Sequence, residues 1–292
     1  MKSILTFLIV TAIAFAFGIA AGSQTIAVGN YSAYFLCVVL AMVINWVAFV
    51  PSAIAKSDTF YDTTGAITYF TVTVAACFMA YSHHGAIDLR SLAIAAMVVI
   101  WCARLGTFLF IRIHAMGGTD SRFEKIKVNP ARFLVAWTLQ GLWVVLTASA
   151  AHVAILAQTR APIGLYFFIG AAVWLFGFVW ESVADAQKSA FKKDPANKGK
   201  FINVGLWRWS RHPNYFGEIT LWTGVLIAAI PVLSGLSWLV VISPIFITLL
   251  LTKVSGVNLQ KQQALERWGD DPDYREYLAN TPMLVPQPPK LG

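Results

Sequence analysis

The sequence predicts an all-α, polytopic integral membrane bundle of seven to eight transmembrane helices, with a C-terminal helical hairpin and a cytoplasmic tail. Its composition is 58% hydrophobic and only 12% charged, with a mean hydropathy of +0.65. Soluble domains carry roughly 25% charged residues, so this chain is too apolar to be one of them. Apolar runs of spanning length recur along the chain, and the basic residues gather between them.

Eight apolar segments are long enough to cross the hydrocarbon layer as helices. They are residues 4–22, 31–50, 61–81, 89–111, 133–157, 163–183, 215–232 and 236–252. The last two form a tight hairpin around Pro231 and Ser234-Gly235. The first segment has the alternative of a signal peptide, but its apolar core is longer than a usual signal core. We therefore expect a retained span.

The basic residues define an orientation. Residues 112–132 carry five, residues 188–211 carry seven, and the tail after residue 252 carries five, together 17 of the 22. Eight spans with both ends inside place all three segments on the cytoplasmic face. We expect a multi-pass protein of a bacterial inner membrane. This topology accounts for the net charge of +8 without a nucleic-acid partner.

The sequence contains no motif of several common catalytic or cofactor sites. GxGxxG, Walker, GxSxG and HExxH motifs do not occur, and the histidines lack companions at ligand spacing. The three cysteines lie singly in different apolar segments, which favours buried thiols over disulfides. We expect neither a bound metal nor a Rossmann fold.

Acidic residues are few, and several lie at membrane depth. Asp62 begins the third span, Glu181 and Asp185 lie i,i+4 near the end of the sixth, and Glu218 lies i,i+4 from Asn214 in the seventh. An ionisable group there costs on the order of 3 kcal/mol and usually faces a partner or a wet cavity. The alternatives to a ligand site are interfacial pairing of the first two with nearby cations, and an interhelical polar contact for the last two.

The stretch "RWSRHPNYFGE" (208–218) has the features of a helix start that binds an anion. Pro213 suits a first helical position, and the free N–H groups of that first turn face the basic segment. Arg208 and Arg211 stand just ahead, where they could hold phosphates or a carboxylate. Asn214 and Glu218 lie deeper and could contact a polar, neutral head group. The stretch predicts an amphiphilic, anion-bearing cofactor that enters from the cytoplasm.

A second basic cluster lies on the same face, in "RIHAMGGTDSRFEKIKVNP" (112–130). It contains Arg112, a Gly117-Gly118 turn, Asp120 and Arg122. Two interpretations remain open: a loop that is basic only because it is cytoplasmic, or a loop that closes over the same anion.

These residues resemble the steroid 5α-reductase family, and more closely its bacterial membrane branch. The likeness rests on "SRHPNYFGE", the apolar hairpin after it and the tail "GDDPDYREYLANTPMLVP". It runs from about residue 90 onward and is strongest over 200–286. The RHPxYxG core is also shared by sterol C14-reductases and by isoprenylcysteine and phospholipid methyltransferases. It therefore identifies a superfamily and leaves the cofactor open.

The reductase branch implies NADPH bound within the helical bundle. Asn214 and Glu218 match the family's Asn-x-x-x-Glu at the nicotinamide end, and Asp185 matches an aspartate near the cofactor ribose. Arg211 lies where it would serve a phosphate. The cofactor-binding residues that the resemblance and the local pattern together indicate are Asn214, Glu218, Arg211, His212, Tyr215, Asp185, Arg208, Asp120, Arg122 and Arg112.

The substrate half departs from the family pattern. The reductases polarise an enone carbonyl with a glutamate on one helix and a tyrosine on the next. Helix order here indicates Asp62, with Tyr61 beside it, as the catalytic pair. The family tyrosine would fall near Trp101, which cannot donate a proton, and the possible substitutes are Tyr61, Tyr69 and Tyr81. Residues 1–85 would then form the substrate side and residues 86–292 the cofactor-binding core.

The leading hypothesis is NADPH-dependent reduction of the C=C bond of a conjugated ketone. The substrate would be lipophilic, a Δ4-3-ketosteroid or related isoprenoid, and would enter a monomeric enzyme laterally from the bilayer. The alternative is an S-adenosylmethionine-dependent membrane methyltransferase of the isoprenylcysteine or phospholipid type. A third option is a transporter or other non-catalytic membrane protein. Membrane lipids are the remaining expected partners.

Overall fold

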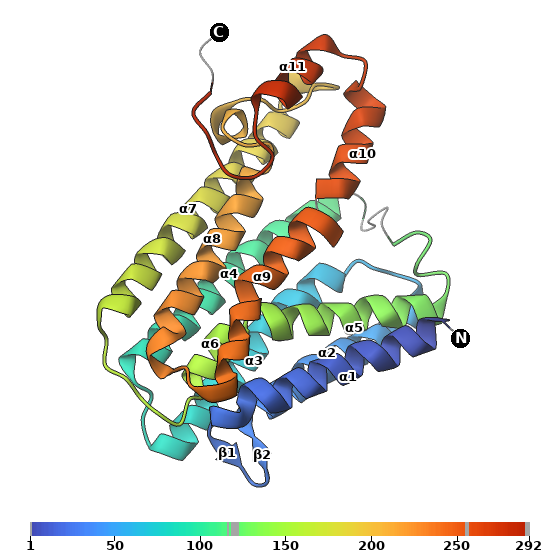
Figure 1. Ribbon diagram of the computed structural model, residues 1–292. Coiled ribbons are helices and arrows are strands. Elements are labelled where there is room, and N and C mark those ends of the chain that lie inside the picture. Colours follow the sequence, from blue (N-terminus) through green and yellow to red (C-terminus); the bar gives the residue numbers. More distant parts are fainter. Residues whose placement is uncertain (1, 116, 118–122, 255–256, 290–292) are drawn as a thin grey trace. The chain divides into compact units, whose positions relative to one another are not determined.

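The computed structural model describes residues 2–115, 117, 123–254 and 257–289 (Figure 1). The chain forms two compact units. Unit 1 comprises Met1–Phe168 and Val225–Ser243, and unit 2 comprises Ile169–Gly224 and Pro244–Gly292. Both units are built from helices, and the described strands are two residues long each, so the predicted all-α class is confirmed.

The predicted spans coincide with the observed helices. Across the described residues, seven helical stretches are long and apolar enough to cross a membrane. A bent pair, α5 (Pro130–Thr147) and α6 (Ser149–Ile155), makes an eighth crossing if it is one span. The protein is therefore a multi-pass membrane protein, as its composition predicts.

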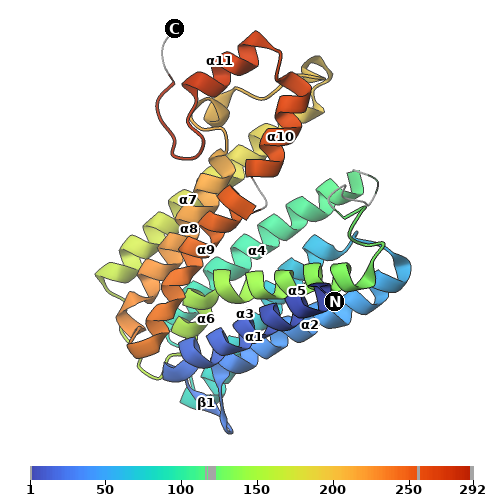
Figure 2. The same cartoon turned by 45° about the vertical axis from the view of Figure 1, so that its right-hand side comes forward.

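Unit 1 contains the N-terminal helices. They are α1 (Lys2–Ala21), α2 (Ala33–Ala55), α3 (Tyr61–His84) and α4 (Leu89–Ala115), followed by α5 and α6. Helix α3 packs along α4, α2 packs on α3 and α5, and α1 lies beside α5 (Figure 2). A short antiparallel hairpin, β1 (Ala27–Val28) and β2 (Tyr31–Ser32), joins α1 to α2 and pairs Val28 with Tyr31.

The predicted continuous span 133–157 is bent by 56°. The bend lies at Ala148, between α5 and α6, where the carbonyl of Thr147 accepts a hydrogen bond from the hydroxyl of Ser243. Just beyond it, the hydroxyl of Ser149 donates to the carbonyl of Leu146 (2.8 Å). Side chains that engage backbone carbonyls in this way are a recognised cause of kinks.

The last predicted span, 236–252, is also less regular than expected. It begins as the 3₁₀ segment η5 (Gly235–Val241), becomes α9 (Ile242–Leu249) and ends in a π-helical turn, Leu250–Val254. Ser234 and Ser237 close the start of η5 in a reciprocal capping box. Pro244 lies in the first turn of α9, where its missing N–H costs nothing.

Unit 2 contains most of α7 (Leu165–Lys193) and α8 (Pro213–Ala229), which run side by side in Figures 1 and 2, and the tail helices α10 (Val257–Trp268) and α11 (Pro272–Asn280). The tail is ordered against the α7–α8 loop, and its aromatic residues Trp268, Tyr274 and Tyr277 favour such packing over disorder from the sequence alone. Tyr277 donates to the carbonyl of Trp207 (2.7 Å) and Trp268 donates to that of Gly199 (2.5 Å). Phe201 packs its ring against Trp268, Tyr274 and Tyr277.

The boundaries of the two units differ from the division at residues 85 and 86, which was predicted from the roles of the two parts of the sequence. The packing boundary in the first half of the chain falls at residue 168, and the C-terminal hairpin returns part of itself to unit 1. The proposed roles of residues 1–85 and 86–292 concern chemistry and not packing, so they stay a prediction.

Candidate cofactor site at the start of α8

The tail holds the residues that precede α8 by backbone hydrogen bonds. Ser210 is fully buried, and its hydroxyl accepts from the backbone N–H of His212 (3.1 Å) and donates to the carbonyl of Leu284 (2.9 Å). The N–H of Arg211 donates to the carbonyl of Pro282 (2.9 Å). Helix α8 then begins at Pro213, as the sequence predicts. The stretch predicted to bind an anion is therefore held by a segment 71 to 74 residues later in the chain.

Glycines bring α7 and α8 into backbone contact. A Cβ atom at Gly177 or Gly224 would lie 2.5 Å from a backbone nitrogen of the facing helix, and one at Gly217 would lie 2.6 Å from the nitrogen of Glu181. Small residues allow this close approach between membrane helices, where packing rather than hydrophobicity drives association. The contact fixes the polar residues of the two helices relative to each other.

Four polar side chains lie on the two facing helices near this contact. Glu181, Asp185 and Glu218 are 2%, 6% and 7% exposed, and Asn214 is half-buried. The amide nitrogen of Asn214 donates to Asp185 Oδ1 (3.2 Å) across the two helices. None of the three carboxylates is isolated, because each interacts with a neighbour. The structure thus joins Asn214 and Asp185, and their role toward a cofactor stays a prediction.

His212 and Tyr215 form the lip of the site. Their rings stack with centroids 5.2 Å apart and planes 6° apart. Burial, and then the neighbouring charges of Lys188 and Arg211, lower the pKa of His212 to about 3. His212 is therefore neutral at physiological pH, and its buried Nδ1 has no hydrogen-bond partner among the described residues. The ring offers a hydrogen-bonding atom and no charge.

Positive charge at the site comes from three side chains. Arg211 is half-buried, and its Nε is buried without a hydrogen-bond partner among the described residues. Lys188 lies with Nζ 4.6 Å above the ring of Trp207, a cation–π contact. Arg208 is exposed. An anion would meet Arg211 and Lys188 at the site and Arg208 at its outer edge.

The predicted catalytic residues lie in unit 1. Tyr61 packs in an aromatic cluster against Phe123 (4.6 Å between ring centroids) and Trp137 (5.1 Å), and its hydroxyl donates to the carbonyl of Ala136 (2.9 Å). Asp62 pairs loosely with Arg112, the nearest atoms being 3.5 Å apart. Their side chains are 21% and 42% exposed. Tyr61 thus has a packing role, whereas Asp62 stays accessible.

The structure places one of the substitute tyrosines beside Trp101. Tyr69 packs edge-on against the Trp101 ring, with centroids 5.1 Å apart at 84°, and both side chains are buried. Tyr81, by contrast, is exposed. Tyr69 therefore contacts the tryptophan at the family's tyrosine position, and a role for it in the reaction stays a prediction.

Sequence reasoning missed a short and largely buried ion pair in unit 1. Lys127 Nζ lies 2.7 Å from Asp58 Oδ1, and the Asp58 side chain is fully buried. The two residues are 69 positions apart, in two polar loops, so no spacing rule joins them.

The predicted residues Asp120 and Arg122 lie outside the described residues. Across the described residues, no three His, Cys, Asp or Glu side chains lie together as metal ligands.

Comparison with known proteins adds a family and two relatives. A family model described as "Protein of unknown function (DUF1295)" matches residues 48–281. An uncharacterized protein of Schizosaccharomyces pombe is 28% identical over 228 residues, covering 68% of this chain and 64% of the relative. A probable O-methyltransferase (ustE) of Ustilaginoidea virens is 37% identical over 73 residues, a quarter of each chain. The chain thus spans less than two thirds of either relative, and no solved structure matches it significantly.

Proposed function

This chain belongs to the DUF1295 family of steroid 5α-reductase-like membrane proteins, and from that premise we propose that it is an NADPH-dependent reductase embedded in the membrane. The proposed reaction reduces the C=C bond of a conjugated ketone in a lipophilic substrate, a Δ4-3-ketosteroid or related isoprenoid. The proposed route of the substrate is from the bilayer, because the helices that cross it are apolar.

The observation that carries the proposal is the pair Asp185–Asn214 with Glu218 beside it on α8. These carboxylates are buried and each already interacts with a neighbour, so together with the amide they form a polar lining that is held in place at membrane depth. A nicotinamide carboxamide and a ribose offer the matching donors and acceptors. The donor set also fits at the other end, where Arg211 Nε is buried and directs a guanidinium edge at an anion.

Each residue then has a defined task. Asp185 and Asn214 accept and donate to the sugar and amide groups, and Glu218 orients the reactive ring. Arg211, with Lys188 and Arg208, binds phosphate from the cytoplasmic side. When bound, NADPH supplies a hydride to the β-carbon of the enone. The dry helical surroundings keep water from that carbon.

On the substrate side, Asp62 is the accessible acid of α3. Its side chain is partly exposed, and its 3.5 Å pair with the more exposed Arg112 is of a kind that contributes little to stability. Tyr69 beside Trp101 offers a second hydroxyl to a carbonyl oxygen. We assign the carbonyl-polarising role to Asp62 and treat Tyr61 as its packed support.

A methyltransferase is the second candidate, and one observation favours it. The relative from Ustilaginoidea virens is named a probable O-methyltransferase. The same buried carboxylates would suit the positively charged ammonium and sulfonium of S-adenosylmethionine.

Ligand titration of the purified protein separates the candidates. A ligand that binds only the folded state raises the unfolding temperature in a saturable way. We expect NADPH to do so and Glu218→Gln to weaken its binding by about tenfold, or ~1.4 kcal/mol. Glu276→Gln, on the exposed surface of α11, is the matched control and should bind as the wild type does. Stabilisation by S-adenosylmethionine instead favours the methyltransferase, and stabilisation by neither argues for a non-catalytic protein.

Turnover tests the substrate side separately. NADPH oxidation is followed by absorbance in nanodiscs that contain a Δ4-3-ketosteroid. Asp62→Asn should lower kcat by roughly 10²-fold or more while leaving the NADPH-dependent shift intact. An Asp62→Asn enzyme with unchanged kcat would remove Asp62 from the mechanism without touching the cofactor assignment.

A further inference from the structure

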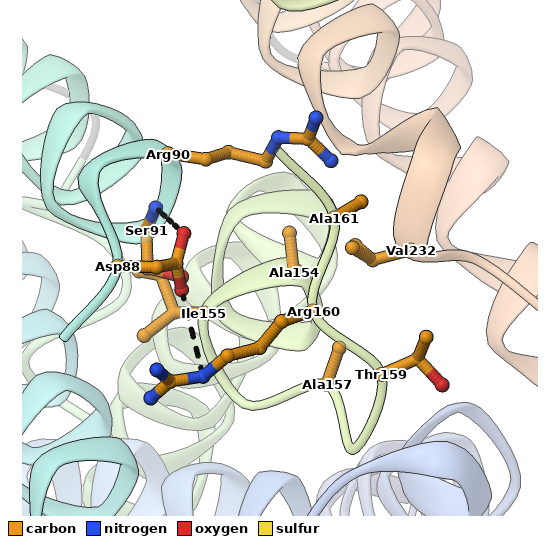
Figure 3. Close-up of a pocket in the computed structure, with 10 residues that line it drawn as sticks. All are labelled: Asp88, Arg90, Ser91, Ala154, Ile155, Ala157, Thr159, Arg160, Ala161 and Val232. Carbon is orange, nitrogen blue, oxygen red and sulfur yellow. Dashed lines mark hydrogen bonds and ion pairs between the residues drawn. The ribbon is translucent and has the colours of Figure 1, made fainter. Parts of the chain in front are cut away.

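A charged pocket lies at the end of unit 1 where α3 ends and α4 begins. It is lined by Asp88 of the α3–α4 loop, Arg90 and Ser91 of α4, and Arg160 of the segment after α6 (Figure 3). None of these residues belongs to the proposed cofactor or catalytic sites. Two guanidinium groups and one carboxylate leave the pocket with a net positive charge.

Asp88 is already satisfied within the pocket. It accepts hydrogen bonds from the Ser91 backbone N–H (3.0 Å) and hydroxyl (2.7 Å), and Arg160 Nε lies 4.0 Å away. Burial raises the pKa of Asp88, but the Ser91 hydrogen bonds and the Arg160 charge outweigh it and lower the pKa overall. Asp88 is therefore an anion committed to Ser91 and Arg160. Arg160 also donates to the carbonyl of Ala86.

Arg90 is the group that remains unbalanced. It is only 3% exposed, and one of its nitrogens donates to the carbonyl of Pro162. Its Nε and Nη1 are buried with no hydrogen-bond partner, and it forms no ion pair within the part of the chain that the structure describes. Figure 3 shows its guanidinium extending to the far side of the pocket from Asp88. The charge of Asp88 acts on Arg90 without forming an ion pair with it, so burial of the guanidinium is only partly compensated, and an arriving anion would add to that compensation.

The size and position of the pocket restrict what that anion can be. The enclosed space is about 10 Å³, which is close to one water molecule, so it can admit one oxygen atom and not a whole polyatomic ion. Leu89 is the first residue of α4, and α6 ends at Ile155. Arg90 and Arg160 therefore flank the ends of membrane-spanning helices, at the level of lipid headgroups.

We propose that this pocket binds the phosphate group of an oxyanion ligand, with one oxygen accepting a hydrogen bond from Arg90 Nε or Nη1 and the remainder at the membrane surface. A guanidinium stays charged at any physiological pH, and its charge-assisted hydrogen bonds to phosphate are stronger than bonds between neutral groups. The phosphate comes either from a phospholipid headgroup or from free inorganic phosphate.

The first test titrates the full-length, delipidated protein in a neutral maltoside detergent with sodium phosphate, against sodium chloride of equal ionic strength. A saturable rise of the unfolding temperature with phosphate, but not with chloride, supports the site and identifies free phosphate as a ligand. The second test is native mass spectrometry after exchange into phosphatidylglycerol or into a galactolipid that lacks phosphate. Retention of phosphatidylglycerol but not of the galactolipid supports the site and identifies the phospholipid headgroup as a ligand.

Variants tie either signal to Arg90. Arg90→Gln should lower the affinity for the bound phosphate or phospholipid by at least about tenfold. Arg267→Gln, at an exposed arginine of α10, should leave that affinity unchanged. Because Arg90→Gln is a core substitution that could unfold the protein, Asp88→Asn provides a second variant. It keeps Arg90 and removes the competing negative charge, so it should tighten phosphate binding several-fold. No response to phosphate together with no selective retention of phospholipid would overturn the proposal and leave a cavity that holds only water. A signal that Asp88→Asn fails to strengthen would overturn it as well.

Discussion

The carboxylates of the candidate cofactor site and the carboxylate of Asp62 are held in opposite ways. Asp185 and Glu218 are almost completely buried, and Asp185 is hydrogen-bonded to Asn214 across two helices in backbone contact. Asp62 is one-fifth exposed and pairs with Arg112 at the long distance of 3.5 Å. Unit 2 thus fixes its polar groups before any ligand arrives, whereas in unit 1 Asp62 is partly exposed and its pair with Arg112 is long.

The difference corresponds to two tasks. A cofactor that returns each cycle is best met by side chains whose geometry is locked by packing, because little ordering then has to occur on binding. A group that polarises a substrate has to exchange contacts during the reaction. The comparison predicts that perturbing the helix contact in unit 2 damages binding, and that perturbing unit 1 damages stability only where a pair is buried.

The largest effect is expected from Gly217→Ala, which attacks the helix contact directly. Its new Cβ would lie 2.6 Å from the backbone nitrogen of Glu181 and 2.7 Å from the carbonyl oxygen of Gly177. Neither backbone atom can move without separating α7 from α8, so we expect a loss of about 3 kcal/mol and of NADPH binding. Thermal unfolding and the NADPH titration measure both.

Gly164→Ala is the control for that substitution. A Cβ there would meet no atom within 4 Å, and Gly164 precedes α7 in unit 1. The control should unfold at the wild-type temperature. If Gly217→Ala did so too, the close contact would not be what orders the site.

The next prediction compares the destabilisation caused by breaking a buried ion pair of unit 1 with that caused by breaking an exposed ion pair. Asp58→Asn leaves Lys127, whose side chain is 15% exposed, without its carboxylate, and we expect about 3 kcal/mol of destabilisation. The matched control is Asp270→Asn, which breaks a fully exposed 3.0 Å pair with Arg275 and should leave the unfolding temperature unchanged. Equal effects of the two variants would mean that burial of Asp58 contributes nothing.

The sequence predicted those features that are local along the chain. Apolar runs of spanning length gave the spans, and Pro213 gave the start of α8, because both depend on neighbouring residues only. The bend at Ala148 could not be predicted, because apolar residues continue on both sides and the hydrogen bond that marks it comes from Ser243. The pairing of Asp58 with Lys127 was equally invisible, since it depends on how two separate loops meet.

Within the candidate site the same rule holds. The i,i+4 spacings placed Asp185 and Asn214 each on the right helix face, but the bond between them depends on the glycines that bring α7 and α8 together. Those glycines are unremarkable in the sequence, where Gly177 and Gly217 are 40 positions apart. The tail contacts to Ser210 and Arg211 are likewise tertiary, and the aromatic tail residues predicted only that the tail packs somewhere.

The smallest effect we predict is a pH dependence of stability that comes from His212 in the candidate cofactor site. His212 has a pKa of about 3 in the folded protein because burial, Lys188 and Arg211 all oppose its protonation, whereas a histidine in the unfolded chain titrates near its usual value of 6.5. Above pH 6.5 neither state binds the proton, so His212 has no effect on stability. As the pH falls from 6.5 toward 3, the unfolded chain binds a proton at His212 and the folded protein does not, so the free energy of unfolding decreases by up to about 1.4 kcal/mol per pH unit.

Thermal unfolding at pH 7.5 and 5.5 should therefore show a smaller loss of stability for His212→Gln than for the wild type, by about 1.4 kcal/mol. Parallel losses in the two proteins would mean that His212 is solvated and takes up a proton in the folded protein.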